Sequence, residues 1–213
     1  MSNLEIALVR ELLGKGEIKS PVLELGVSYD VDFIMKDVFA KQQIEYFGTD
    51  IHSGKDVDFI IDFEDDIDSI RQQYPALPSF KTILILNVLE HTYNPIKVLQ
   101  NALHLLSKDG ILVVSTPSVF PIHNYPIDVY RLLPDFYIEF ARREQVSLVP
   151  EYFRFLGYGQ VDDYRNESQV YFPKPWKSKW HEWRSRLIHK LFDTTGRGMA
   201  YPSHISISAV FRK

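Results

Sequence analysis

The sequence predicts an α/β fold in which a mainly parallel β-sheet is covered by helices on both faces. Short apolar runs rich in branched residues alternate along the chain with longer segments whose apolar residues recur at helical spacing. In addition, residues 81–117 read as strand, loop, helix, turn and strand, which is the pattern of a right-handed parallel βαβ unit.

The first part of the chain predicts six elements in alternating order. They are a covering helix at 4–13, a strand at 22–25, a helix at 31–42, strands at 44–47 and 58–62, and a helix at 66–74. We expect the helix at 31–42 to bury Phe33, Ile34, Val38 and Met35, and the strand at 58–62 to bury its central apolar residues.

The second part continues the alternation. A strand at 82–86 precedes a helix that begins near Pro95 and buries Ile96 and Leu99. Gly110 is expected to end this helix, and Pro117 to stop the strand at 111–115. The remaining elements are a helix at 133–145 and strands at 147–155 and 205–211.

The composition fits one globular domain of 213 residues with a net charge of −4, which argues against binding nucleic acid through overall charge. Without cysteine the chain has no disulfide, thiol nucleophile or thiolate metal site. Its N-terminus lacks the apolar core of a secretory signal, so we expect a cytoplasmic protein. Within the single domain we expect a covering helix at 1–19, a cofactor-binding core at 20–143 and a sheet-completing, acceptor-side part at 144–213.

Residues 87–117, NVLEHTYNPIKVLQNALHLLSKDGILVVSTP, carry a family resemblance. This gap-free block resembles the second half of the class I methyltransferases that depend on S-adenosylmethionine (SAM), in particular a branch acting on small molecules and glycans. The resemblance extends over about residues 20–143 and departs at 108–110, where the family has a Gly-Gly pair. It implies a Rossmann-like three-layer sandwich with a mainly parallel seven-stranded sheet and an antiparallel last strand. It also implies SAM as cofactor, S-adenosylhomocysteine as product, and an O-methyltransferase that modifies a surface polysaccharide or a natural product.

The end of the first strand is the first place to look for a ligand, because open α/β sheets bind ligands at the carboxyl ends of their strands. Glu24 and Gly26 match the family's first motif, whereas Ser28 and Asp30 replace its later glycines. A dinucleotide needs those glycines for its pyrophosphate, but SAM has no phosphate, so the pattern favours SAM over NAD or FAD. The structural alternative for Gly26 is a tight strand-to-helix turn.

Further cofactor contacts are expected at the ends of the next strands. Asp50 follows Gly26 at a spacing suited to a carboxylate that binds both ribose hydroxyls, although an aspartate in a strand-end turn is also common. The resemblance implies that Asp62 and Phe63 meet the adenine and that Asn87 contacts the methionine part of SAM.

Glu90 and His91 follow the fourth strand, beside the expected position of the transferred methyl group. The pair can serve in acid–base catalysis, or as metal ligands like those of some quinone-forming relatives, or can cap the next helix. One adjacent Glu-His pair is not a complete ligand set, so the sequence assigns no metal.

Residues 121–134 resemble the segment that borders the acceptor in this branch. We expect His123 to be the catalytic base, because a histidine titrates near neutral pH. Tyr125, Asp128, Tyr130 and Arg131 are expected to bind a polar or anionic acceptor. Alternatively, Asp128 and Arg131 pair with each other and brace the loop.

The segment 173–192 interleaves basic residues with tryptophans. Its apolar stripe falls on one helical face and consists of Trp176, Trp180, Trp183, Leu187 and Leu191. It fits either a membrane surface or dimer contact, or packing on the core. For the whole chain, the alternatives to an enzyme using SAM are a degenerate methyltransferase fold that serves as a binding or scaffolding subunit, and a nucleotide-dependent oxidoreductase.

Overall fold

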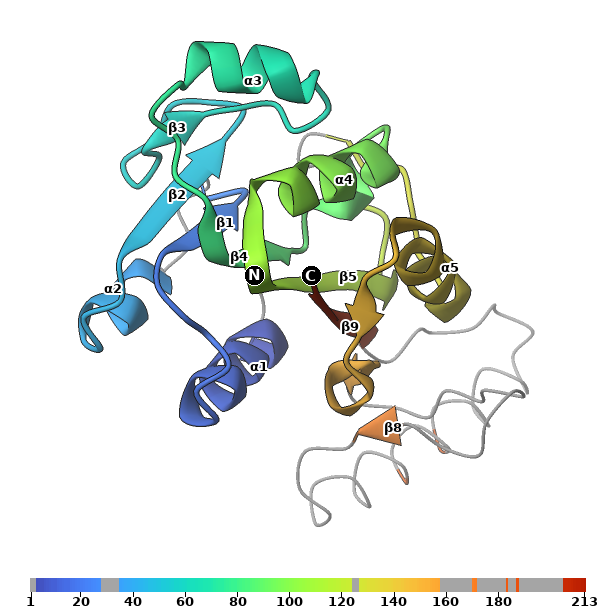
Figure 1. Cartoon of the computed structure of the whole chain (residues 1–213). Helices are drawn as coiled ribbons and strands as arrows, with labels where there is room; N and C mark the ends of the chain where they lie inside the picture. The colour runs from blue at the N-terminus through green and yellow to red at the C-terminus, as the bar shows by residue number, and fades with distance from the viewer. Residues whose placement is uncertain are drawn as a thin grey trace.

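The computed structural model describes residues 3–27, 35–123, 127–157, 170–171, 183, 187 and 205–213 (Figure 1). Strands in this part of the chain form one sheet, in the order β3-β2-β1-β4-β5-β9-β7-β8, with β6 also paired to β9. Their bounds are Val22–Leu25 (β1), Tyr46–Asp50 (β2), Phe59–Ile60 (β3), Phe80–Leu86 (β4), Leu106–Val119 (β5), Ser147–Leu148 (β6), Arg154–Gly157 (β7), Val170–Tyr171 (β8) and Ile205–Arg212 (β9).

Strands β1 to β5 pair in parallel, and β9 runs antiparallel to β5, which confirms the predicted sheet type. The sheet has more strands than the expected seven for two reasons. The predicted strand at 147–155 is split into β6 and β7, which pair with the same edge of β9, because Pro150 begins a 3₁₀ turn between them. The short strand β8 adds an edge beside β7.

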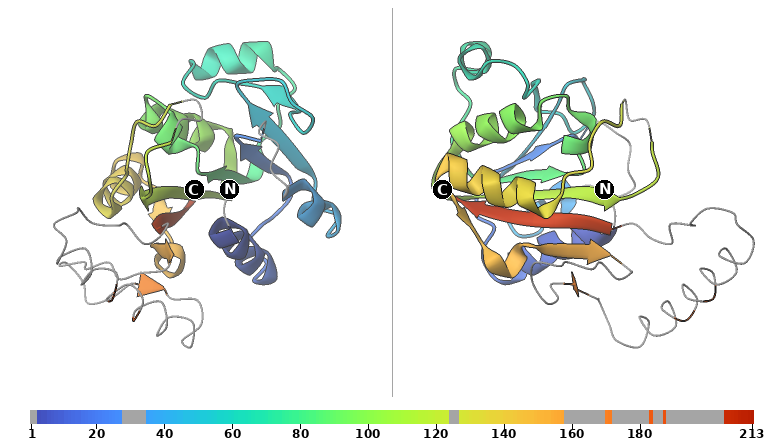
Figure 2. Two further views of the ribbon diagram at one scale, coloured as in Figure 1. Left: turned by 180° about the vertical axis from the view of Figure 1, so that it is seen from behind. Right: turned by 90° about the vertical axis from the view of Figure 1, so that its right-hand side faces the viewer.

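Helices cover both faces of the sheet (Figures 1 and 2). Helices α1 (Asn3–Gly14) and α2 (Met35–Ala40) contribute to one apolar cluster, which includes Leu8 and Phe39. Helices α3 (Ile67–Gln73), α4 (Pro95–Leu105) and α5 (Pro134–Glu144) contribute to a larger cluster on the other face. Two cores separated by one sheet are the three-layer sandwich that the resemblance implies.

Local sequence accounts for several helix ends. The side chain of Asp66 accepts a hydrogen bond from the backbone N–H of Asp68 and so caps α3. The side chain of Asn94 caps α4 by accepting a hydrogen bond from the backbone N–H of Lys97. Pro95 occupies the first turn of α4, where a backbone N–H would have no acceptor within the helix, so proline is tolerated there. Helix α5 ends at Gln145, which adopts the left-handed conformation.

Two expectations around α4 and β5 were wrong. The helix ends at Leu105 rather than at Gly110, because the Nζ of Lys213 at the far end of the chain donates to the carbonyl oxygen of Leu103 in the last turn and to that of Leu106 just after it. Gly110 instead allows its own backbone to lie close to that of Ser107, since a β-carbon at Gly110 would lie 2.9 Å from the carbonyl oxygen of Ser107.

Strand β5 also continues through Pro117 to Val119 instead of stopping there. The carbonyl oxygen of Ser115 accepts a hydrogen bond from the N–H of Asn87, so the backbone polar groups of Ser115 face β4. Pro117 lies two residues further and faces the same side, beyond the end of β4 at Leu86, where no backbone donor is needed.

The burial predictions were partly wrong as well. Ile96 is 49% exposed and Ile60 is 46% exposed, because each lies on the outer side of its element. Helix α2 buries Met35 and Phe39 and half-buries Val38, while Phe33 and Ile34 lie outside the described residues. Every residue of β9 before Arg212 is buried, because this strand lies inside the sheet rather than at its edge.

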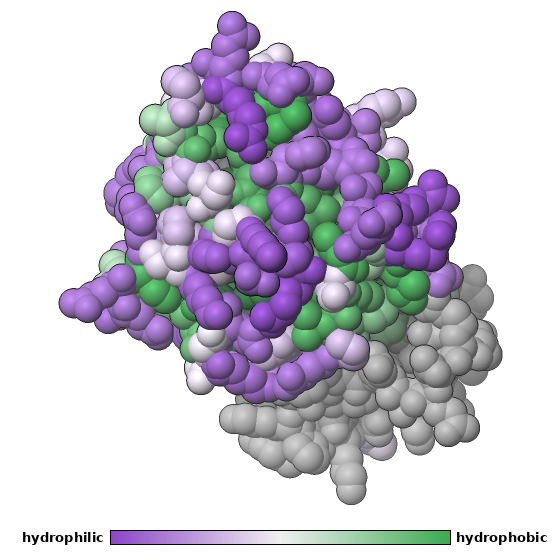
Figure 3. Space-filling view, in the orientation of Figure 1, coloured by the Kyte–Doolittle hydropathy of each residue, from purple (hydrophilic) through white to green (hydrophobic). Residues whose placement is uncertain are grey.

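No helix within the described ranges has the length and apolar character needed to cross a bilayer. On the face shown in Figure 3, hydrophilic residues predominate, and hydrophobic residues emerge between them in small groups.

Candidate functional site

The strand order of the sheet reverses between β1 and β4, and the loops that follow these two strands touch at Gly26. Gly26 has a φ of +80°, and its N–H donates to the carbonyl oxygen of Thr49 at 2.8 Å. A β-carbon at this position would lie 2.6 Å from Cγ2 of Val88, so any larger residue would push the two loops apart. Glycine is therefore required here both for its backbone conformation and for close approach.

Glu24 lies on β1, on the face of the sheet that α1 and α2 cover, and its side chain is buried. The hydroxyl group of Tyr46 donates a hydrogen bond to its Oε2 at 2.7 Å, and the ring of Tyr46 stacks on Phe39. Burial raises the pKa of Glu24 to about 7, although the hydrogen bond from Tyr46 opposes this shift. Glu24 is thus a buried acid held by one tyrosine.

Asp50 ends β2 within the strand itself rather than in a turn after it. Alternation along β2 places Asp50 on the same face of the sheet as Tyr46, and therefore on the same face as Glu24. Its Oδ1 accepts the N–H of His52 at 3.0 Å, and its carbonyl oxygen accepts the N–H of Ile61 at 2.9 Å. Both predicted carboxylates thus occupy one face at neighbouring strands.

Asp62 and Phe63 follow β3 but differ in their surroundings. Asp62 is exposed, and its Oδ1 accepts the N–H of Glu64 at 2.8 Å. Phe63 is buried in the larger apolar cluster, and its carbonyl oxygen accepts a hydrogen bond from the side chain of Asn101. Asp62 therefore faces solvent, while Phe63 belongs to the core.

Asn87 follows β4 directly and has a φ of +56°, a conformation that asparagine tolerates better than most residues. Its Oδ1 is buried, and no hydrogen-bond partner for it exists in the described part of the chain. A buried acceptor without a donor is unusual, so this oxygen marks a position suited to a ligand that donates hydrogen bonds.

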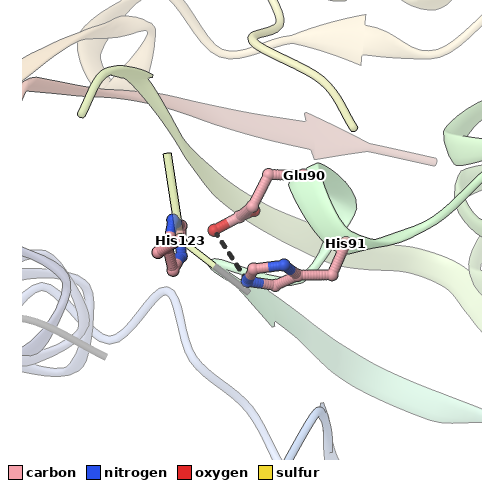
Figure 4. A group of neighbouring side chains, drawn as sticks. All are labelled: Glu90, His91 and His123. Atoms are coloured by element: carbon pink, nitrogen blue, oxygen red, sulfur yellow. Dashed lines mark ion pairs between the residues drawn. The ribbon is translucent and has the colours of Figure 1, made fainter. Parts of the chain in front are cut away.

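Glu90, His91 and His123 form a cluster in which each offers one ligand atom close to those of the other two (Figure 4). The first two come from the 3₁₀ turn η1 (Leu89–His91), and His123 comes from the loop after β5. Oε1 of Glu90 lies 3.7 Å from Nε2 of His91, and the two histidine rings meet edge to face at 4.9 Å between centroids. The fold therefore joins the two histidines that the sequence proposed separately.

The electrostatics of this cluster are set by burial. Glu90 is 1% exposed, and burial raises its pKa to about 8. Burial also lowers the pKa of His91, whose Nδ1 contacts the carbonyl oxygen of Ile127. A carbonyl oxygen only accepts, so Nδ1 of His91 carries the hydrogen and Nε2 presents its lone pair toward Glu90.

The loop after β5 is braced by its own charged pair. Both guanidinium Nη atoms of Arg131 bind the carboxylate of Asp128, and Nη2 also donates to the carbonyl oxygens of Phe120 and Pro121. Asp128 in turn accepts the N–H of His123 at 2.9 Å. Pairing with Arg131 holds the pKa of Asp128 well below its usual range. This geometry matches the bracing alternative for Asp128 and Arg131.

Tyr130 also has a local partner, since its hydroxyl group donates to the carbonyl oxygen of Tyr93 at 3.1 Å. Ser28 and Tyr125 lie outside the described residues. In the segment 173–192 only Trp183 and Leu187 are described, and both side chains are exposed. These two members of the predicted stripe do not pack in either apolar cluster, and a membrane or dimer contact stays a prediction.

Sequence reasoning missed Glu5, a fully buried carboxylate on α1. Its Oε1 accepts hydrogen bonds from the hydroxyl groups of Ser115 at 3.1 Å and Ser206 at 3.0 Å, at the centre of the β5–β9 pair. A signal was available, because Leu8, Val9 and Leu12 follow Glu5 at helical spacing and define a buried face that includes it.

A family model described as a methyltransferase domain matches residues 3–196 of the chain. No sequence among the curated proteins matches it.

Solved structures with a similar fold include a SAM-dependent methyltransferase from Archaeoglobus fulgidus, at 12% identity and a TM-score of 0.54 over 100% of this chain and 95% of that one. A second is 1,6-didemethyltoxoflavin-N1-methyltransferase from Burkholderia thailandensis, at 14% identity and a TM-score of 0.51 over 99% of this chain and 77% of that one. A third is coclaurine N-methyltransferase, at 14% identity and a TM-score of 0.52 over 98% of this chain and 72% of that one. The second and third were crystallised with S-adenosylhomocysteine.

Proposed function

Because the chain belongs to the methyltransferase-domain family, it is a SAM-dependent methyltransferase of the class I fold, and we propose that it methylates a hydroxyl oxygen of a small molecule or a glycan. The observation that carries the proposal is the arrangement after β4, where the unpartnered oxygen of Asn87 precedes the cluster of Glu90, His91 and His123.

Asn87 supports the position of the cofactor. The amino acid part of SAM carries an ammonium group, which donates hydrogen bonds, and the buried Oδ1 of Asn87 accepts them. Gly26 contacts Val88, the residue after Asn87, at a distance that leaves no room for a side chain. Asp50, on the neighbouring strand, is the proposed ribose ligand.

The cluster supports an acceptor that must lose a proton. Methyl transfer is an in-line displacement at an activated carbon, so the protein has to align the acceptor and remove its proton. A hydroxyl group is a weak nucleophile until that proton leaves. A histidine with a lowered pKa, such as His91, is neutral near pH 7 and can take the proton, and His123 is the second candidate base.

The braced loop supports a defined acceptor position. Asp128 and Arg131 hold each other and the backbone of His123, so we propose that they position this histidine rather than bind the acceptor themselves. Tyr125 and Tyr130 remain the proposed acceptor contacts. The choice of a sugar or natural product rests on the resemblance of residues 121–134 to loops of methyltransferases with such acceptors.

A calorimetric titration of the full chain with SAM, S-adenosylhomocysteine and NADH tests the proposal. We expect both SAM compounds to bind and NADH not to bind. Failure of both SAM compounds would favour a scaffolding protein, and tight binding of NADH would favour an oxidoreductase. Incubation with SAM and a panel of hydroxylated acceptors, followed by mass spectrometry, then identifies the acceptor class by the gain of one methyl group.

A further inference from the structure

We propose that Glu90, His91 and His123 bind a divalent transition-metal ion of the zinc type, with at least one coordination position left for the acceptor. The sequence offered only the adjacent pair Glu90 and His91, and the fold supplies the third ligand from a different loop. The catalytic meaning of the metal rests on the proposed function, whereas metal binding can be measured without it.

The spacing of the ligand atoms suits a metal. One carboxylate oxygen of Glu90 and one ring nitrogen from each histidine all lie within 4.8 Å of one another. Zinc bonds of about 2.1 Å with tetrahedral angles place ligand atoms roughly 3.4 Å apart. The 3.7 Å between Oε1 of Glu90 and Nε2 of His91 is already close to that separation, so small side-chain movements complete the site.

Glu90 supplies an independent observation. Its carboxyl group is buried, and neither of its oxygens has a hydrogen-bond partner among the residues that the structure describes. A buried carboxylate without hydrogen bonds costs several kcal/mol of stability in the absence of a compensating partner. Both oxygens can instead bind a cation, and the histidine rings beside them show where that cation would lie (Figure 4).

Each histidine of the cluster also has a neighbouring oxygen that can orient its ring, as metal-ligating histidines usually do. Ligating histidines typically bind a backbone carbonyl or a carboxylate through the ring atom that does not face the metal. The Nδ1 of His91 contacts the carbonyl oxygen of Ile127, which leaves Nε2 for the metal. The buried carboxylate of Asp128 lies 3.2 Å from Nδ1 of His123 and also holds its backbone.

The rings are held in place from the outside as well. Phe120 packs edge to face on His123 at 5.0 Å between centroids, on the loop that Arg131 braces. A ligand set held before the metal arrives loses less conformational entropy on binding.

The donor set indicates the class of metal. Two imidazole nitrogens and one carboxylate oxygen suit zinc, cobalt, iron or nickel, whereas magnesium and calcium prefer oxygen ligands alone. Three protein ligands are typical of catalytic sites, which keep a position open for water or substrate. A zinc-type ion at that position lowers the pKa of a coordinated hydroxyl group.

The coordinated acceptor hydroxyl loses its proton to solvent, and the resulting oxygen attacks the methyl carbon of SAM. The carbon–sulfur bond breaks with its electron pair going to sulfur, which yields S-adenosylhomocysteine and the methylated acceptor. In the metal-bound protein the two histidines act as ligands, and the metal replaces them in activating the acceptor.

The test uses the full chain stripped with a chelator and dialysed. Zinc is titrated by calorimetry, and cobalt is titrated while its visible absorption is followed, since bound cobalt in a low-coordinate site is strongly coloured. We expect one ion per chain and a coloured complex. Glu90→Gln and His91→Ala should each weaken zinc binding by about 10- to 100-fold or more.

The matched control is His104→Ala, which removes an exposed histidine of α4 that is not a member of the cluster, and this variant should bind zinc like the parent protein. Glu90→Gln keeps the shape of the side chain but cannot form a carboxylate ligand, and circular dichroism confirms that the variant is folded. Equal zinc affinity for the parent, Glu90→Gln and His91→Ala proteins would overturn the site. Titration of SAM in the same samples separates this outcome from failure of the proposed function.

Discussion

Val88 lies so close to Gly26 that a β-carbon at the glycine would be 2.6 Å from its Cγ2 atom. This contact joins the loops after β1 and β4, and the φ of +80° at Gly26 disfavours any side chain there. We expect Gly26→Ala to lower the free energy of unfolding by about 1–3 kcal/mol and to weaken SAM binding.

The control for this variant is Gly14→Ala, because no atom lies within 4 Å of the β-carbon built at Gly14. Adding Val88→Ala to Gly26→Ala removes the clash but not the backbone strain, so it should restore only part of the stability. Urea denaturation and SAM calorimetry measure both effects. A Gly26→Ala protein as stable and as tight-binding as the parent would refute this role of the contact.

His123 should matter for turnover and not for cofactor affinity. Its ring packs edge to face on that of His91, on the loop after β5 that is proposed to border the acceptor. We expect His123→Ala to reduce kcat by at least about 100-fold, whether the histidine acts as base or as metal ligand, while the Kd for SAM stays unchanged. His104→Ala is the control, and unaltered turnover of His123→Ala would remove this residue from the mechanism.

Glu24 predicts a specific pH dependence of stability. Its pKa is raised from 4.5 in an unfolded chain to about 7 in the folded protein, so the folded state binds the extra proton between these values. The contribution of Glu24 to the free energy of unfolding is therefore fully present below about pH 4.5 and is lost as the pH rises toward 7. The total loss is about 3 kcal/mol.

Glu24→Gln should remove this part of the pH dependence while keeping an acceptor for the hydroxyl group of Tyr46. Comparing the free energy of unfolding of the two proteins by urea denaturation at about pH 5 and about pH 8 measures the difference. The two proteins should diverge mainly at the higher pH, where the parent has lost its stabilising proton. Parallel stability curves would show that Glu24 titrates normally.

Arg131→Lys should loosen the acceptor loop, because lysine cannot bind the carboxylate of Asp128 through two nitrogens. We expect a higher KM for the acceptor and a loss of about 1–3 kcal/mol of stability, since Asp128 is buried. Arg142→Lys disrupts a similar pair with Glu139 on the exposed side of α5 and should leave stability nearly unchanged, because solvent screens an exposed pair. Steady-state kinetics and thermal unfolding distinguish the two variants, which would behave alike if the brace were unimportant.

The sequence predicted several elements almost residue by residue. Strand β1 and helices α1, α3 and α5 match their predicted ranges closely, because each carries strong local signals such as the capping residue Asp66 or the first-turn Pro134. The wrong predictions concern element ends that are determined by contacts with segments distant in sequence. Helix α4 ends early because Lys213 satisfies its carbonyls, and Pro117 stays in β5 because β4 ends beside it.

The sequence by itself determined the α/β class, the parallel βαβ unit and the glycine at the end of β1, since periodicity and turn chemistry are local properties of the chain. Only the tertiary structure decided that His123 joins Glu90 and His91, and that Glu5 is buried beneath β5 and β9. The reason is that these contacts join loops and strands far apart in sequence, and only the order of the strands brings them together.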